Sequence, residues 1–227
     1  GRNNGLKLMG IFFLFTTIAM VLYPGGYNLN PNTSGYSFIF NFFSDLGMLT
    51  SFSNESNLYG SILFTMATLS IGLSMIPFFI TFPFLFKSKY SRTLAIFGAF
   101  LGVISAIAYI GIGFTPWDVY LRAHMIFVYI AFPLTSPVII LFVSVIFFDS
   151  DVPNKIAYMY LILGVILFSY LYLLFFGPSG GTEKGRAIQV IGQKIIVYTE
   201  ILTFLVQGVY TSQFFIQNYM SGQNLNI

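Results

Sequence analysis

The sequence predicts an all-α protein, a polytopic transmembrane bundle of six helices with a long aromatic first external loop. Charged residues make up only 7% of the 227 residues, whereas soluble domains contain about 25%. Hydrophobic residues make up 56%, and the mean hydropathy is +0.82. So few charges could not cover the surface of a soluble domain of this size, so a hydrocarbon environment is the simplest explanation.

Six apolar segments approach or exceed the roughly 20 residues that a bilayer crossing needs. These predicted spans, which together form one domain of residues 1–227, cover approximately residues 8–23, 58–86, 93–114, 124–148, 156–176 and 188–215. The first span is the shortest. Pro77 and Pro83 in the second span and Pro133 and Pro137 in the fourth predict kinks or local breaks, because proline removes a helical hydrogen bond.

Six crossings place both termini on one side of the membrane. Basic residues are more frequent on that side, largely because of residues 87–92, so the positive-inside rule predicts cytoplasmic termini. The loop of residues 24–57 is then external, and it contains N-x-[ST] sequons at Asn32 and Asn54. Its aromatic run, residues 36–43, predicts either an interfacial or re-entrant element or a plain cap over the helix ends.

Composition excludes several classes of function. The chain has no cysteine, which excludes disulfides, thiolate nucleophiles and cysteine-bound metals. The single histidine, His124, excludes two-histidine metal motifs, and no phosphate-binding glycine loop is present. We therefore expect no metal and no cofactor. The net charge of +3 is explained by membrane orientation rather than by a nucleic-acid partner.

The last span contains polar residues at helical spacing. They are Gln189, Gln193, Glu200, Thr203, Gln207 and Thr211. On a helix they form one stripe, which must face the bundle interior or a wet cavity. Two interpretations are open: hydrogen-bonded contacts between helices, or a substrate- or proton-handling site with Glu200 as its ionisable group. Lys194 lies about 120° away around the helix and is expected to extend to the external interface.

A second polar group lies before the fourth span. Asp118 and Arg122 are four residues apart, so they are expected to pair on the first helical turn. His124 begins the apolar run, either as a hydrogen-bonded packing residue or as an acid–base group. Residues 183–186 are interpreted as a solvated loop surface.

The polar residues are expected to converge on the external half of the bundle. The candidate ligand-binding residues are Ser44, Asp45, Asp118, Arg122, His124, Arg186, Gln193 and Glu200. Together they predict an external-facing polar pocket covered by the aromatic loop.

Short motifs spread over most of the chain resemble those of a known family. They are Gly35-Tyr36-Ser37, Phe43-Ser44-Asp45-Leu46-Gly47, Gly113-Phe114-Thr115-Pro116 with Asp118 and His124, and Gly181 through Arg186. This pattern resembles the domain-of-unknown-function 998 family of bacterial and archaeal membrane proteins. The resemblance implies a six-span fold, and that family has no established activity.

A more distant resemblance is to the Frag/DRAM/Sfk family of six-span proteins. Its I-S-D-T-G motif is similar to residues 43–47, and its histidine and late acid are similar to His124 and Glu200. This chain departs from that family at Ile201, where the family has tryptophan. The resemblance implies a role in lipid handling.

Three functions follow as hypotheses. The first is binding or handling of a membrane lipid or lipid-like ligand in the external pocket. The second is an accessory or structural subunit of a larger membrane-protein complex. The third is a membrane-embedded enzyme with Asp45 and His124 as an acid–base pair, although no catalytic motif is present.

Overall fold

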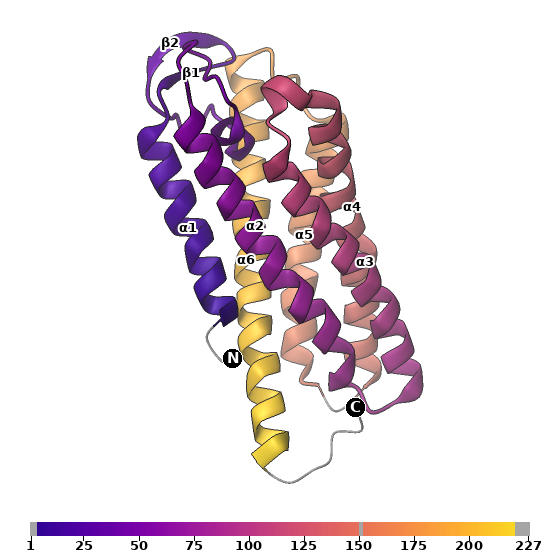
Figure 1. Cartoon of the computed structure of the whole chain (residues 1–227). Helices are drawn as coiled ribbons and strands as arrows, with labels where there is room; N and C mark the ends of the chain where they lie inside the picture. The colour runs from indigo at the N-terminus through magenta and orange to yellow at the C-terminus, as the bar shows by residue number, and fades with distance from the viewer. Residues whose placement is uncertain (1–3, 150–151, 221–227) are drawn as a thin grey trace.

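The structure, a computed structural model, describes residues 4–149 and 152–220 and confirms an all-α bundle of six helices (Figure 1). The helices are α1 (Asn4–Leu22), α2 (Leu58–Thr81), α3 (Lys89–Phe114), α4 (Trp117–Phe148), α5 (Asn154–Phe176) and α6 (Glu183–Met220), and a 3-10 turn, η2 (Phe82–Leu85), extends α2. Five helices, α2 to α6, are long and apolar enough to cross a membrane, and α1 contributes a shorter apolar helix, Gly10–Leu22. The chain is therefore a helical membrane protein.

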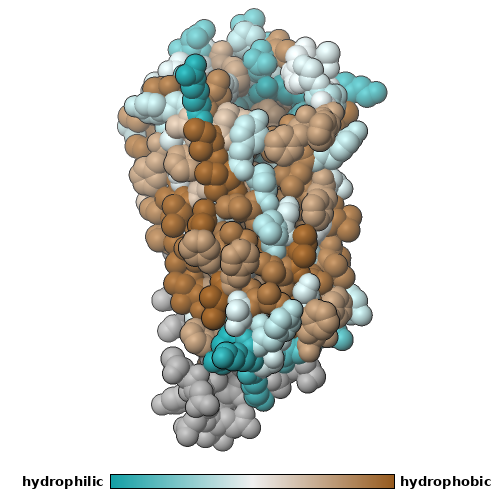
Figure 2. Space-filling model, turned by 90° about the vertical axis from the view of Figure 1, so that its right-hand side faces the viewer, coloured by the Kyte–Doolittle hydropathy of each residue, from teal (hydrophilic) through white to brown (hydrophobic). Residues whose placement is uncertain are grey.

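The helices alternate in direction, so α1 begins and α6 ends at the same end of the bundle (Figure 1). Residues 23–57 cover the other end, which we call the capped end. The face drawn in Figure 2 is apolar through its middle and polar at both ends, as expected for a protein that spans a bilayer.

Small residues allow close approach of neighbouring helices. A Cβ atom on Gly72 of α2 would lie 2.8 Å from the Ala106 carbonyl oxygen of α3. A Cβ atom on Gly102 of α3 would lie 2.4 Å from the ring of Phe79. Glycine is thus required at both positions, as is common where membrane helices pack on one another.

The prolines disturb the helices less than the sequence predicts. Pro77 lies inside α2, and Pro83 lies in the 3-10 turn η2 that follows it. Pro133 and Pro137 lie inside α4, where the one residue with non-helical dihedral angles is Tyr120 (φ −120°, ψ 46°). Non-helical dihedral angles in α4 therefore occur in its first turn, before the predicted span of residues 124–148, and not at the prolines.

The loop of residues 23–57 is folded, and it contains a β-hairpin that the sequence analysis did not predict. Its elements are β1 (Gly25–Tyr27), β2 (Asn30–Ser34), which pairs antiparallel with β1, and the 3-10 helix η1 (Phe43–Gly47). Gly26 has φ +79°, and a Cβ atom there would lie 2.8 Å from the Phe52 backbone. The loop corresponds to the cap alternative, because it covers the ends of α1, α2 and α6 (Figure 1).

Candidate functional site

A buried ion pair joins the loop to the start of α6. Asp45 in η1 is 1% exposed, and its Oδ2 accepts a hydrogen bond from Nη2 of Arg186 at 3.0 Å. Nε of Arg186 donates to the Phe40 carbonyl at 2.5 Å. The guanidinium also lies over the rings of Phe42 and Phe52, at 5.1 and 5.5 Å from their centroids. Arg186 is therefore enclosed by the loop, and the prediction of a solvated surface at this residue is wrong.

Asn41 organises the same part of the loop, and its side chain is fully buried. Its Nδ2 donates to the Gly26 carbonyl at 3.0 Å and to Asp45 Oδ2 at 3.2 Å, and its Oδ1 accepts from the Ser37 N–H at 2.9 Å. Asp45 Oδ2 also accepts from the Phe42 N–H at 2.9 Å. Oδ2 of Asp45 thus accepts two hydrogen bonds from within the loop, one from the Asn41 side chain and one from the Phe42 backbone.

Lys194 of α6 is buried, with 2% of its surface exposed. Its Nζ donates to the Asn41 carbonyl at 2.5 Å and lies over the rings of Tyr36, Phe38 and Phe43, at 5.3, 4.8 and 5.4 Å from their centroids. The prediction that Lys194 extends to the interface is wrong, because the loop supplies a carbonyl and aromatic faces that attract the ammonium group.

Basic groups outnumber acidic groups in the buried part of this end. Two buried basic side chains, Arg186 and Lys194, lie near one buried carboxyl group, Asp45. Burial raises the pKa of the Asp45 carboxyl, and the Arg186 guanidinium is the strongest opposing influence. Burial also raises the pKa of the Tyr36 hydroxyl well above its usual range. With both basic side chains and the acid charged, this buried region has one excess positive charge.

Gln193 completes what we call the capped-end cluster, which consists of Asn41, Asp45, Arg186, Gln193 and Lys194. Its Oε1 accepts a hydrogen bond from the Phe43 N–H at 2.9 Å. Ser44 follows in the chain and is half-buried, and no hydrogen bond of its side chain is seen within residues 4–149 and 152–220. The α6 side chains of the cluster therefore hold η1 and its preceding residues against the helix.

The structure does not contain the predicted pair of Asp118 and Arg122. The Asp118 carboxylate instead accepts hydrogen bonds from the backbone N–H groups of Leu49 and Thr50, both at 3.0 Å to Oδ2. Arg122 is exposed, and no ion pair between it and Asp118 is found in the described part of the chain. The non-helical Tyr120 lies between the two residues, so the spacing of an ideal helix does not apply.

His124 is 4% exposed and lies within the first turns of α4. Its Nδ1 is 2.8 Å from the Thr115 carbonyl oxygen, which can only accept, so Nδ1 carries the hydrogen. Thr115 follows the last residue of α3, and the bond holds the α3–α4 connection together. No hydrogen bond between His124 and Asp45 is seen among the described residues, so this geometry does not support an acid–base pair.

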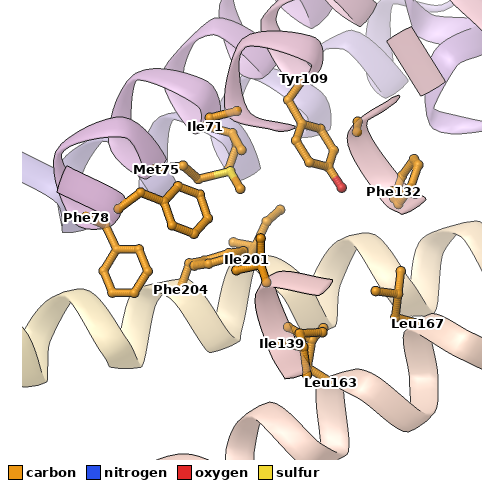
Figure 3. Packing of buried hydrophobic residues seen from close by; sticks show 14 of the residues in the cluster. Ile71, Met75, Phe78, Tyr109, Phe132, Ile139, Leu163, Leu167, Ile201 and Phe204 are labelled. Carbon is orange, nitrogen blue, oxygen red and sulfur yellow. The ribbon is translucent and has the colours of Figure 1, made fainter. Parts of the chain in front are cut away.

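The polar stripe of α6 faces the bundle interior, as predicted. Beyond the capped-end cluster its buried members are Glu200, Thr203, Gln207 and Thr211. Glu200 is 4% exposed, and its Oε2 accepts a hydrogen bond from the Tyr109 hydroxyl of α3. In Figure 3 the Tyr109 side chain extends from α3 into a space surrounded by apolar side chains.

A small cavity lies beside Glu200, between α1, α2, α3 and α6. It is lined by Phe12, Thr68, Ile71, Met75, Tyr109, Val197, Glu200, Ile201 and Phe204. The cavity offers about 30 Å³ of space for the centres of water molecules. A single water needs about 10–15 Å³, so the cavity is large enough for water but too small for a lipid head group.

The candidate residues therefore do not form one pocket, and that prediction is wrong. Asp45, Arg186 and Gln193 meet in the capped-end cluster, whereas Glu200 contacts Tyr109 inside the bundle. Asp118 and His124 each bind a different backbone segment. Sequence reasoning missed Lys194 and Asn41 as members of the cluster. The sequence feature that could have identified Lys194 is its position within the predicted apolar span of residues 188–215, where a lysine is unusual.

Comparisons with models of protein families, with characterised proteins and with solved structures found no match to this chain.

Proposed function

We propose that the protein binds an anionic membrane lipid at its capped end, with Arg186 and Lys194 supplying positive charge. The observation that supports this proposal is the excess of buried basic groups: two buried basic side chains accompany one buried carboxyl group, Asp45. A buried charge without a partner is costly, and a phosphate oxygen would provide that partner through charge-assisted hydrogen bonds.

The surroundings of Lys194 suit such a ligand. A lysine ammonium has three N–H donors, and a single one is needed for the Asn41 carbonyl. The ring of Phe38 lies over the ammonium and is itself 50% exposed, so Lys194 is one side chain away from the surface. Rotation of Phe38 would admit a head group while the acyl chains stay in the membrane. This is the reason for proposing a lipid rather than a soluble anion.

The proposed orientation places the capped end outside the cell and both termini in the cytoplasm. The basic residues 87–92 then follow the positive-inside rule. The resemblance to the domain-of-unknown-function 998 and Frag/DRAM/Sfk families is part of the same proposal, and the lipid role of the second family agrees with it.

The proposal is tested by native mass spectrometry of protein extracted gently from its own membrane and then exchanged into nanodiscs. We expect the protein to retain phosphatidylglycerol in preference to phosphatidylcholine. Lys194→Gln should lose this preference, whereas Lys184→Gln, which changes an exposed lysine of the same helix, should keep it. Equal retention of both lipids, or an unchanged preference in Lys194→Gln, would refute the proposal.

A second candidate function is an accessory subunit of a membrane-protein complex. The apolar part of α5 is 28% buried, the lowest value among the five long spans. Its outer surface includes Tyr158, Phe168 and Tyr172, each more than half exposed. The same mass spectra distinguish the candidates, since a subunit would retain another membrane protein at fixed stoichiometry.

A further inference from the structure

We infer that Glu200 is a proton-exchange site inside the bundle, linked through water at Gln207 and Thr211 to the end opposite the cap. The site is separate from the capped-end cluster and does not depend on lipid binding. The inference is based on buried polar atoms that lack partners, on the cavity beside Glu200 and on the spacing of α6.

The two oxygen atoms of the Glu200 carboxyl group differ in their hydrogen bonds. Oε2 accepts from Tyr109, but Oε1 has no partner in the part of the chain that the structure describes. The Thr135 hydroxyl of α4 faces Glu200, yet it donates to the Ala131 carbonyl at 3.0 Å. Ser105 of α3 donates to the same carbonyl at 2.8 Å. Both hydroxyls thus have a backbone acceptor, and among the described residues no hydrogen bond to Oε1 is seen.

The charged and titratable groups around Glu200 indicate that its carboxyl group carries a proton. The titratable groups that face it are the hydroxyls of Tyr109 on α3 and Tyr170 on α5. Helices α1 and α2 contribute only uncharged side chains to the cavity wall, among them Phe12 and Thr68. No described cation neutralises the carboxylate, and an unpaired charge in such an environment is strongly disfavoured. A proton on Oε1 removes that cost and can be donated to Thr135 or to water.

The polar stripe of α6 continues past Glu200 with two further buried side chains, Gln207 and Thr211. Gln207 and Thr211 follow Glu200 by seven and eleven residues, about two and three helical turns, which places them on the same face. They are 1% and 4% exposed, yet among the described residues Oε1 and Nε2 of Gln207 and Oγ1 of Thr211 have no hydrogen-bond partner. Buried polar groups without partners are rare in folded proteins, and ordered water is the usual partner.

The geometry therefore points to bound waters along about 16 Å of α6, from Glu200 to Thr211. The cavity beside Glu200 has room for the first of them. In the exchange step the O–H bond of Glu200 breaks, an O–H bond forms on the adjacent water, and that water passes a proton to the next one. A proton reaches bulk water at the opposite end, and a carboxylate remains until the reverse transfer.

The experiment is infrared spectroscopy of the protein in liposomes during transfer from H₂O to D₂O. We expect a carboxylic-acid C=O band that is absent in Glu200→Gln and that shifts on deuteration in the wild-type protein. Gln207→Leu should slow this shift about tenfold or more, because it removes the polar groups that hold water in an apolar interior. Gln213→Leu is the matched control, since Gln213 is an exposed glutamine on the same helix, and it should leave the rate unchanged.

The outcomes separate the parts of the inference. If Glu200→Gln removes no C=O band between neutral and mildly acidic pH, Glu200 is ionised and the inference is wrong. If the shift is equally fast in the wild-type protein and Gln207→Leu, the route along α6 is wrong. Thr211→Val keeps the side-chain shape and should also slow the shift, so it replaces Gln207→Leu if that variant fails to fold.

Discussion

Oδ2 of Asp118 accepts a hydrogen bond from the backbone N–H of Thr50 at 3.0 Å. This bond and its neighbour at Leu49 attach the end of the long loop to the first turn of α4. The loop is therefore attached to α6 through the capped-end cluster and to α4 through Asp118.

Asp118→Asn should loosen residues 48–57, because an amide oxygen is a weaker acceptor than a carboxylate and its NH₂ group cannot accept. We expect a loss of about 1 kcal/mol in the free energy of unfolding. Trp117, whose ring centroid is 5.8 Å from that of Phe52, should report the change as a shift in fluorescence emission. Arg122→Gln is the control and should alter neither quantity. An effect of Arg122→Gln equal to that of Asp118→Asn would show that the two residues act as the helical pair that the sequence predicts.

The second prediction concerns the pH dependence of the buried ion pair. Arg186→Met leaves Asp45 buried without its main counter-charge, and burial already raises the pKa of this carboxyl above its unfolded value. A group with a raised pKa in the folded state contributes stability that is complete below its unfolded pKa and is lost as the pH rises through the folded pKa. The difference in thermal stability between Arg186→Met and the wild-type protein should therefore be smaller at acidic pH and larger at alkaline pH.

Asp45→Asn is the matched variant for the same pair. It leaves the Arg186 guanidinium buried without a carboxylate, so we expect a loss of stability from the missing charge-assisted hydrogen bonds. Because asparagine does not titrate, the stability of this variant should lack the pH dependence that Asp45 contributes. The double variant should lose less than the sum of the single losses, because neither charge then remains unpaired. Thermal unfolding in detergent from mildly acidic to alkaline pH measures all three. Parallel pH profiles for the two single variants would contradict this account.

The third prediction concerns helix packing. Gly72→Ala should destabilise the bundle, because the new Cβ atom would lie 2.8 Å from the backbone oxygen of Ala106 and force α2 away from α3. We expect a loss of about 1–3 kcal/mol. Gly208→Ala on α6 is the control, since beyond the adjacent backbone of α6 no described atom lies within 4 Å of its Cβ position. It should be neutral or stabilise the helix by about 0.5–1 kcal/mol. Equal unfolding temperatures for the two variants would show that α2 and α3 can separate at little cost.

The sequence predicts the helices well because a helix that crosses the hydrocarbon core must be apolar over about 20 residues. Apolar length alone locates the long spans, and the spacing of Glu200, Thr203, Gln207 and Thr211 identifies the inward face of α6. These features depend on neighbours three and four residues apart, which a single sequence displays.

The sequence does not predict contacts between distant segments. Lys194 lies under the aromatic loop because Asn41, 153 residues earlier, presents a carbonyl oxygen to it. The pairing of Asp118 with Arg122 fails because Tyr120 departs from helical geometry. In both cases the deciding interaction involves the loop or the irregular turn beside it, and no residue pattern within one helix encodes it.

The separation of Asp45 and Arg186, 141 residues along the chain, has a consequence for synthesis in the cell. The ribosome completes the loop well before it makes α6. While the intervening helices insert, Asp45 and its aromatic neighbours therefore lack their contacts with Arg186 and the rest of α6. When α6 packs against the loop, the ion pair forms and the capped end is completed in one step. A chain that stops before α6 would display this unfinished loop, which would give membrane proteases and chaperones a direct means to recognise incomplete copies.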